Sequence, residues 1–156
     1  MTASATSYEV RVSGRVDAPA SQVYAVIADY RRHHPHIIPR EYFLRLDVLA
    51  GGVGAGTRTR VAMRVLGRTR EFEQVVTEPE PGRVLMETDS DGVSVSTFTI
   101  ERIDGGRAAW VTIATDLVAR PGLAGRLERW VTSTMLRRIY RQEIALLAAY
   151  VLRQAA

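Results

Sequence analysis

Apolar residues fall at every second position near the start of the chain, which predicts a strand with one buried face. Tyr8, Val10, Val12 and Val16 alternate with polar residues, and a period of two is typical of strands. The pattern breaks at Asp17-Ala18-Pro19. There we expect the aspartate to cap a helix and the proline to lie in its first turn.

Two short helices are predicted after this strand. Val23, Val26 and Ile27 recur at helical spacing, which indicates a first helix. Pro35 and Pro39 bracket the next element, and because proline interrupts a helix, this second element is limited to a turn or two.

Six further strands and a long helix account for the rest of the chain. Alternating runs separated by glycine and proline turns predict strands near residues 43–50, 57–66, 68–78, 83–89, 93–103 and 108–119. Beyond Pro121-Gly122 the period becomes helical, and the predicted buried side carries Leu127, Trp130, Val131, Met135, Ile139, Leu146 and Tyr150. The pattern predicts an α+β fold with a curved seven-stranded antiparallel sheet wrapped around a C-terminal helix.

The order and spacing of these features resemble the START-like, or SRPBCC, superfamily, which includes the Bet v 1-like proteins. The resemblance covers essentially the whole chain and implies the helix-grip fold. Because this fold hosts carriers, cyclases, hydrolases and protein-binding modules, it does not select an activity. The residues that carry it are Val16-Asp17-Ala18-Pro19, Val23-Tyr24, Ile27-Ala28-Asp29-Tyr30, Pro35, Pro39, Gly56, Gly67, Glu78-Pro79, Gly82-Arg83 and the terminal helix.

Composition narrows the possible chemistry. The chain has 156 residues, 46% of them hydrophobic, which fits one domain spanning residues 1–156. It contains no cysteine, which excludes disulfides, thiol catalysis and thiolate metal sites. All 21 basic residues are arginines, which excludes Schiff-base chemistry on lysine and favours a bacterial source with a GC-rich genome.

Charge and hydropathy bear on partners and location. The net charge of +4 permits weak attraction to anionic partners. The basic residues are interleaved with 17 acids and do not alternate with aromatic residues, so no nucleic acid is expected. No apolar run approaches the ~20 residues that span a bilayer. Met1 to Ser7 is expected to be a disordered polar tail, not a signal peptide. We expect a cytoplasmic protein without a transmembrane segment, and the oligomeric state is left open.

A cavity is expected between the sheet and the helix, because a curved sheet and one diagonal helix cannot touch along their whole length. Alternation assigns the inward half of each strand to its lining, and the apolar side of the long helix adds Trp130 and Met135. The resemblance adds Tyr24 and Tyr30. The predicted ligand-binding residues are Tyr24, Tyr30, Thr59, Val61, Met63, Arg70, Phe72, Gln74, Met86, Ser96, Phe98, Ile113, Thr115, Trp130 and Met135.

Several chemistries are not supported by the residues present. His33-His34-Pro35-His36 lacks the spacing of a metal site, so we expect no metal and a solvated segment at the mouth of the cavity. No cofactor is expected. Gly51 to Gly56 leads into a strand and lacks the lysine of a phosphate-binding loop. The acidic segment from Glu87 to Asp91 is interpreted as a solvated strand end.

Two branches of the superfamily resemble the chain more closely. Aromatic polyketide cyclases resemble it in overall pattern and need only positioning and a few polar groups, for which Arg70, Gln74, Tyr24 and Tyr30 are candidates. Coenzyme Q-binding START proteins and ribosome-association proteins are similar in their N-terminal motif. The segment Arg40-Glu41-Tyr42 departs from the tryptophan-containing pattern of that branch.

Three functions therefore stay open from the sequence. The first is a carrier or sensor of a hydrophobic or aromatic molecule, such as a lipid, a prenylquinone or a polyketide-like ligand. The second is a polyketide cyclase or dehydratase that uses the same cavity, with Arg70, Gln74 and Tyr30 as catalytic candidates. The third is a protein- or ribosome-interaction module that uses the basic helix face of Arg126, Arg129, Arg137, Arg138 and Arg141.

Overall fold

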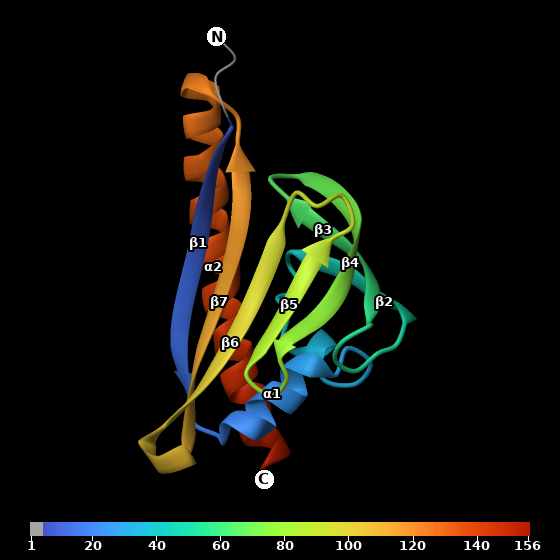
Figure 1. The fold of residues 1–156 in the computed structure, drawn as a ribbon, viewed down its shortest axis with the longest axis vertical. Coiled ribbons are helices and arrows are strands. Elements are labelled where there is room, and N and C mark those ends of the chain that lie inside the picture. Colours follow the sequence, from blue (N-terminus) through green and yellow to red (C-terminus); the bar gives the residue numbers. More distant parts are fainter. Residues whose placement is uncertain (1–4) are drawn as a thin grey trace.

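The computed structural model describes residues 5–156 and contains seven strands that form one antiparallel sheet (Figure 1). The order across the sheet is β1-β7-β6-β5-β4-β3-β2, so the first and last strands are neighbours. The elements are β1 (Thr6–Val16), α1 (Ala20–Ala28), the 3-10 turn η1 (His34–His36), β2 (Phe43–Ala50), β3 (Arg58–Val65), β4 (Arg68–Glu80), β5 (Val84–Asp89), β6 (Val95–Ile103), the 3-10 turn η2 (Asp104–Gly106), β7 (Ala108–Ala119) and α2 (Gly122–Gln154).

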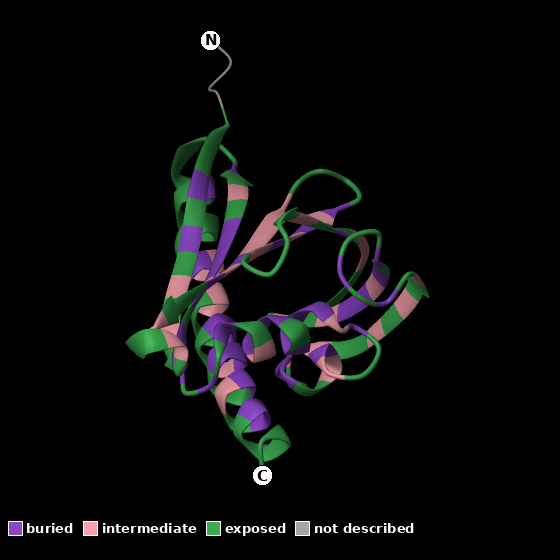
Figure 2. Ribbon diagram, turned by 60° about the horizontal axis from the view of Figure 1, so that its bottom comes forward, coloured by how far each residue is buried: buried purple, intermediate pink, exposed green. Residues whose placement is uncertain are grey.

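The helix α2 runs behind β1 and β7, and α1 lies near its C-terminal half (Figure 1). A Cβ atom built on Gly14 would lie only 2.8 Å from Cγ2 of Ile144. Strand β1 and α2 can therefore approach this closely only because position 14 has no side chain. Buried residues gather around α1 and this half of α2 (Figure 2), and they include Ile27, Ile139 and Leu147.

The predicted fold class is confirmed, and every predicted strand is present with its bounds shifted by two residues at most. The two short helices after the first strand are α1 and the single turn η1. Strand β1 already includes Thr6 and Ser7, so the predicted tail is shorter than expected. Residues 1–4, which belong to that predicted tail, lie outside the described part of the chain.

The predicted cap of α1 is wrong. Pro19 occupies the N-cap position itself, and no side chain caps the helix. Asp17 instead accepts a 2.7 Å hydrogen bond from Nε of Arg15 on the surface. The carbonyl of Pro19 accepts from the backbone amides of Gln22 and Val23, which starts the helix without a side-chain cap.

The predicted buried side of α2 is wrong in its N-terminal half. Leu127 and Trp130 are 62% and 66% exposed, whereas Gly125 and Ser133 are the buried residues of this half. The physical reason is that only β1 and β7 back this part of the helix, so its large apolar residues have nothing to pack against. Of the other residues on the predicted side, Ile139 and Tyr150 are buried, Val131 and Met135 are half-buried, and Leu146 is exposed.

The predicted inward side of β5 is also wrong. Leu85 is buried, together with Glu87 and Asp89, while Met86 points to the outer face. The register explains this, because Glu87 pairs with Val76, which is fully buried on the inner face of β4. The acidic residues of β5 are therefore turned into the protein.

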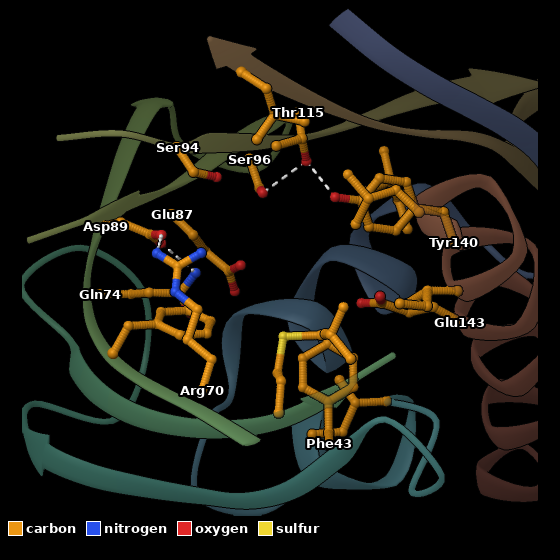
Figure 3. A pocket seen from close by; sticks show the side chains of 18 of the residues that line it. Phe43, Arg70, Gln74, Glu87, Asp89, Ser94, Ser96, Thr115, Tyr140 and Glu143 are labelled. Carbon is orange, nitrogen blue, oxygen red and sulfur yellow. Dashed lines mark hydrogen bonds and ion pairs between the residues drawn. The ribbon is translucent and has the colours of Figure 1, made fainter. Parts of the chain in front are cut away.

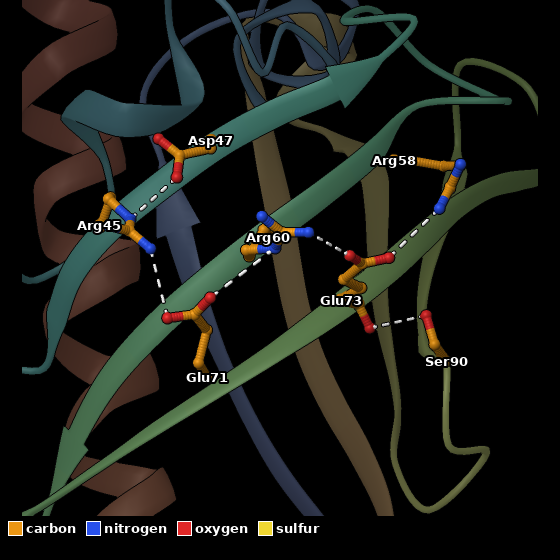
Figure 4. A network of polar contacts seen from close by, with 7 residues as sticks. All are labelled: Arg45, Asp47, Arg58, Arg60, Glu71, Glu73 and Ser90. Carbon is orange, nitrogen blue, oxygen red and sulfur yellow. Dashed lines mark hydrogen bonds and ion pairs between the residues drawn. The ribbon is translucent and has the colours of Figure 1, made fainter.

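The outer face of β2 to β4 carries a network of ion pairs (Figure 4). Alternation in β4 turns Glu71 and Glu73 outward, where Arg60 lies 3.7 Å from the first and 2.8 Å from the second. Exposed pairs of this kind contribute only about 0–1 kcal/mol each. Within residues 5–156, no helix has both the length and the apolar character needed to cross a membrane.

Candidate functional site

A cavity of about 260 Å³ lies between the inner face of the sheet and α2 (Figure 3). This volume lies just below the ~300 to 1,000 Å³ typical of sites for drug-sized ligands, so it suits a compact molecule better than a long chain. The lining is divided almost evenly between apolar and polar side chains. Its residues are His34, Ile38, Phe43, Leu46, Met63, Val65, Arg70, Phe72, Gln74, Glu87, Asp89, Val93, Ser94, Ser96, Phe98, Ile113, Thr115, Leu117, Thr132, Met135, Leu136, Ile139, Tyr140 and Glu143.

Strand register assembles the polar part of the lining into a continuous band across the sheet. Gln74 on β4 pairs with Asp89 on β5. Glu87, which lies two residues before Asp89 on β5, pairs with Ser96 on β6. Ser96 in turn pairs with Thr115 on β7. Because directly opposed residues of an antiparallel pair place their side chains on the same face, these five residues line one wall of the cavity.

Asp89 is held at one end of this band by two donors. Nε2 of Gln74 donates a 3.2 Å hydrogen bond to Oδ1 of Asp89, and Nη2 of Arg70 lies 3.6 Å from Oδ2. Burial raises the pKa of Asp89, and the bond from Gln74 opposes that rise. Arg70 is half-exposed at the mouth, stacks over the ring of Phe72 and also pairs with Asp91.

A chain of three hydroxyl groups lies at the other end of the band. Oγ of Ser96 is 2.8 Å from Oγ1 of Thr115, which also hydrogen-bonds the hydroxyl of Tyr140 on α2 (Figure 3). Burial raises the pKa of Tyr140, so its hydroxyl keeps its proton over the ordinary pH range. The hydroxyl of Tyr140 can therefore donate or accept a hydrogen bond, but it does not act as a general base.

His34 and Tyr30 approach the band from the turn after α1. Nδ1 of His34 lies 2.7 Å from the carbonyl oxygen of Ile27. Because a carbonyl only accepts, Nδ1 carries the hydrogen, and in the neutral ring Nε2 has the free lone pair. Nε2 lies 3.8 Å from Oε1 of Glu87, which accepts a 2.5 Å hydrogen bond from the hydroxyl of Tyr30.

Glu143 is the most unusual group in the lining. It projects from α2 into the cavity, across from Arg70 and Gln74 (Figure 3). It is only 4% exposed, and within the described chain no side chain donates a hydrogen bond to it. Burial, followed by the nearby charge of Glu87, raises its pKa well above the ordinary value. Burial therefore favours the neutral acid form of Glu143, which faces the cavity and has no hydrogen-bond donor among the side chains of residues 5–156.

The structure brings nine of the fifteen predicted ligand-binding residues to the cavity. They are Met63, Arg70, Phe72, Gln74, Ser96, Phe98, Ile113, Thr115 and Met135. Whether they contact a ligand stays a prediction.

The other six lie outside the lining. Tyr24 is buried and donates a 2.6 Å hydrogen bond to Glu78, and Tyr30 lies behind the lining against Glu87. Thr59 and Val61 are fully buried in the core. Met86 faces the outer side of the sheet, and Trp130 is exposed on α2.

Seven polar residues of the lining were not among the predicted ones: His34, Glu87, Asp89, Ser94, Thr132, Tyr140 and Glu143. His34 is buried, so its interpretation as part of a solvated segment is wrong, and so is that of Glu87 and Asp89 as a solvated strand end. A signal for the helix residues exists in the sequence, because Tyr140, Glu143 and Leu147 recur at positions that share one helix face. In residues 5–156 no three His, Cys, Asp or Glu side chains are grouped as metal ligands would be.

The curved sheet, the long helix packed on it and the cavity between them define a START-like fold of the small-molecule-binding kind. The chain belongs to the family described as polyketide cyclase / dehydrase and lipid transport proteins, whose model matches residues 7–152. No match is found among curated protein sequences.

Solved structures with the same fold are similar over nearly the whole chain. The solution structure of the KanY protein has a TM-score of 0.81 at 24% identity and covers 94% of this chain and 98% of its own. The Zhui aromatase/cyclase from Streptomyces sp. R1128 has a TM-score of 0.78 at 16% identity and covers 97% of both chains. Norcoclaurine synthase from Thalictrum flavum, in complex with dopamine and hydroxybenzaldehyde, has a TM-score of 0.72 at 17% identity and covers 96% and 89%. At these identities the likeness establishes the fold alone.

Proposed function

We propose that the chain binds a compact aromatic or polyketone-like molecule in the cavity and catalyses its cyclisation and dehydration. The observation that carries this proposal is Glu143, whose buried carboxyl group faces the cavity and has no side-chain hydrogen-bond donor among residues 5–156. A purely apolar ligand would leave that group unsatisfied, at a cost of about 1–3 kcal/mol. A ligand that presents a carbonyl oxygen would accept its hydrogen bond. The family's description and the aromatase/cyclase among the similar structures agree with this choice.

The groups around the cavity match the needs of an aldol-type ring closure. A base removes a proton from a carbon between two carbonyl groups, and the resulting enolate carbon bonds to a third carbonyl carbon, whose oxygen then takes up a proton. We assign the base to Nε2 of His34 and the proton donor to Glu143, while Arg70 and Tyr140 donate hydrogen bonds to carbonyl oxygens. The ring-closed product has the composition of its precursor.

Loss of water uses the same two groups. Proton exchange with water first returns His34 to its neutral form and Glu143 to its acid form. The base then removes a second proton beside a carbonyl group, and the hydroxyl on the adjacent carbon departs as water with a proton from the acid. This step forms a carbon–carbon double bond and requires no oxidant, which is consistent with aromatisation by dehydration alone.

A carrier of a hydrophobic molecule, such as a lipid or a prenylquinone, is the second candidate. The apolar half of the lining supports it, particularly Phe43, Leu46, Met63 and Phe72 near one another on β2, β3 and β4. The volume of the cavity favours a compact headgroup or ring over a complete prenyl chain. A carrier would bind its ligand without changing it.

Mass spectrometry can separate the two functions. The native protein is incubated with poly-β-ketone mimics and with short-chain prenylquinones, and both retained ligand and product are recorded. We expect a ring-closed, dehydrated product, and we expect Glu143→Gln to lower its rate of formation by at least about 100-fold. Glu128→Gln, an exposed change on the same helix, is the matched control and should leave the rate unchanged. Binding without product at every protein concentration would establish the carrier instead.

A further inference from the structure

The outward side of α2 presents a straight line of exposed residues that changes character along the helix. Leu123, Leu127 and Trp130 occupy positions i, i+4 and i+7, and all three are more than half exposed. Thr134 continues the same line, and Arg137 and Arg141 follow it one and two turns further along the helix. All three are exposed. We call these six residues the outer line of α2. It runs from Leu123 to Arg141, and these two residues lie about 27 Å apart along the helix axis.

The charge around this line is positive and not neutralised by the rest of the chain. Within residues 5–156, no ion pair involves Arg126, Arg137, Arg138 or Arg141. The only acid between positions 126 and 141 is Glu128, which lies 3.6 Å from Arg120. This face is therefore complementary in charge to an anionic partner. A second copy of the chain would bring the same positive face, so self-association is disfavoured.

We propose that the outer line of α2 docks the protein on an anionic lipid bilayer. Its leading turns carry two leucines and a tryptophan, and tryptophan favours the boundary between lipid headgroups and acyl chains because its ring is apolar and its N–H is polar. Arg137 and Arg141 lie about two and three turns beyond Trp130, where they meet the headgroup phosphates when the N-terminal end of α2 tilts into the membrane. A straight line on a helix fits a flat surface without rearrangement of the fold.

Docking here also bears on how an apolar ligand reaches the cavity. Thr132, Met135 and Leu136 line the cavity from the same turns of α2 whose outward side carries Trp130 and Arg137. Apolar molecules concentrate in bilayers, so a protein held on the membrane by this helix has its cavity next to that supply. The docking surface itself does not depend on which ligand the cavity holds.

Vesicle binding tests the proposal directly. The Trp110→Phe variant keeps Trp130 as its sole tryptophan, which serves as the fluorescence reporter. This variant is titrated with vesicles of pure phosphatidylcholine and with vesicles that contain about 30% phosphatidylglycerol, in ~0.1 M salt. We expect binding and a blue shift of Trp130 emission with the anionic vesicles, and much weaker binding to neutral ones. Flotation of the native protein with the same vesicles measures binding without the reporter substitution.

Variants assign the binding to this face. Leu123→Ser with Leu127→Ser should weaken partitioning by at least about tenfold, and Arg137→Gln or Arg141→Gln by about fivefold each. Matched controls lie elsewhere: Leu152→Ser changes an exposed leucine at the far end of α2, and Arg107→Gln changes an exposed arginine beside η2. Both should bind as the native protein does, and thermal melts verify that every variant is folded.

Three results would overturn the proposal. The first is the absence of binding to either kind of vesicle with unchanged Trp130 emission. The second is an equal loss of binding in Leu152→Ser or Arg107→Gln. The third is concentration-dependent self-association in sedimentation experiments that Leu123→Ser with Leu127→Ser abolishes, because this would make the face an interface between copies of the chain.

Discussion

The hydroxyl of Tyr30 donates a 2.5 Å hydrogen bond to Oε1 of Glu87, and both side chains are buried. The ring of His34 stacks on that of Tyr30 with centroids 4.3 Å apart, and its Nε2 lies 3.8 Å from the same carboxylate oxygen. A single oxygen of β5 thus holds the turn after α1 against the sheet. This contact fixes His34 where it lines the cavity.

Removing the donor of this contact should destabilise the protein. Tyr30→Phe keeps the ring and its stacking on His34 but leaves the buried carboxylate of Glu87 without its hydroxyl partner. Because this change leaves a buried acceptor unsatisfied, we expect a loss of about 1–3 kcal/mol in the free energy of unfolding, measured by urea denaturation. In a Glu87→Leu background the same change should cost much less. A double-mutant cycle with a coupling below about 0.5 kcal/mol would contradict the assignment.

The buried acid of Glu143 makes stability depend on pH. Its pKa in the folded protein is raised by burial, so between the ordinary carboxyl value and that raised value the unfolded chain is ionised and the folded one is not. The folded state then binds more protons, and stability falls as pH rises through this window. Glu143→Gln removes the effect, so its advantage in unfolding free energy should be small near pH 4 and should grow by up to about 1.4 kcal/mol per pH unit above it.

Urea unfolding of both proteins from pH 4 to pH 9 measures this difference. Glu128→Gln serves as the control, because the side chain of Glu128 is exposed on the same helix and its replacement should give a flat difference. A flat profile for Glu143→Gln as well would show that its carboxyl group is hydrated in the folded protein.

The volume of the cavity can be tested with two methionines on opposite faces of the sheet. Met63 lines the cavity, whereas Met86 points to the outer face. Met63→Trp should fill part of the 260 Å³ and lower the affinity for an apolar fluorescent probe at least about tenfold while leaving a cooperative melt. Met86→Trp should leave probe binding unchanged. Equal loss of binding in both variants would place the probe outside the cavity.

The fold was predictable because its determinants are local. Turn residues separate runs of alternating residues, and each run from Phe43 to Ala119 is long enough to mark a strand. The phase of β5 was not predictable in this way, because Val84, Leu85 and Met86 are all apolar and carry no alternation. Only the pairing of Glu87 with Val76 on β4 decides which side faces inward.

The polar half of the site was hidden for a related reason. Hydrophobic periodicity assigns polar residues to the surface, so a buried acid such as Glu143 counts as evidence against the helix face that carries it. Leu127 and Trp130 are apolar, so the same rule assigned them to the buried side of α2, although both are exposed. Contacts such as that of Tyr30 with Glu87 join positions 57 residues apart, and no local pattern reports them.

Arg70 and Gln74 both serve Asp89, but their removal should have different consequences. Gln74→Leu deprives a nearly buried carboxylate of its hydrogen-bond donor, so we expect a loss of about 1–3 kcal/mol in stability. Arg70 is 55% exposed and lies 3.6 Å from Asp89, so Arg70→Met should change stability by less than about 1 kcal/mol.

If Arg70 holds a carbonyl oxygen of the substrate, the same change should lower kcat by about 100-fold or more. Arg58→Met, which removes an exposed ion pair on the outer face, should alter neither quantity. Urea melts and turnover of a poly-β-ketone mimic measure both effects, and an Arg70→Met protein with native kcat would remove this arginine from the proposed chemistry.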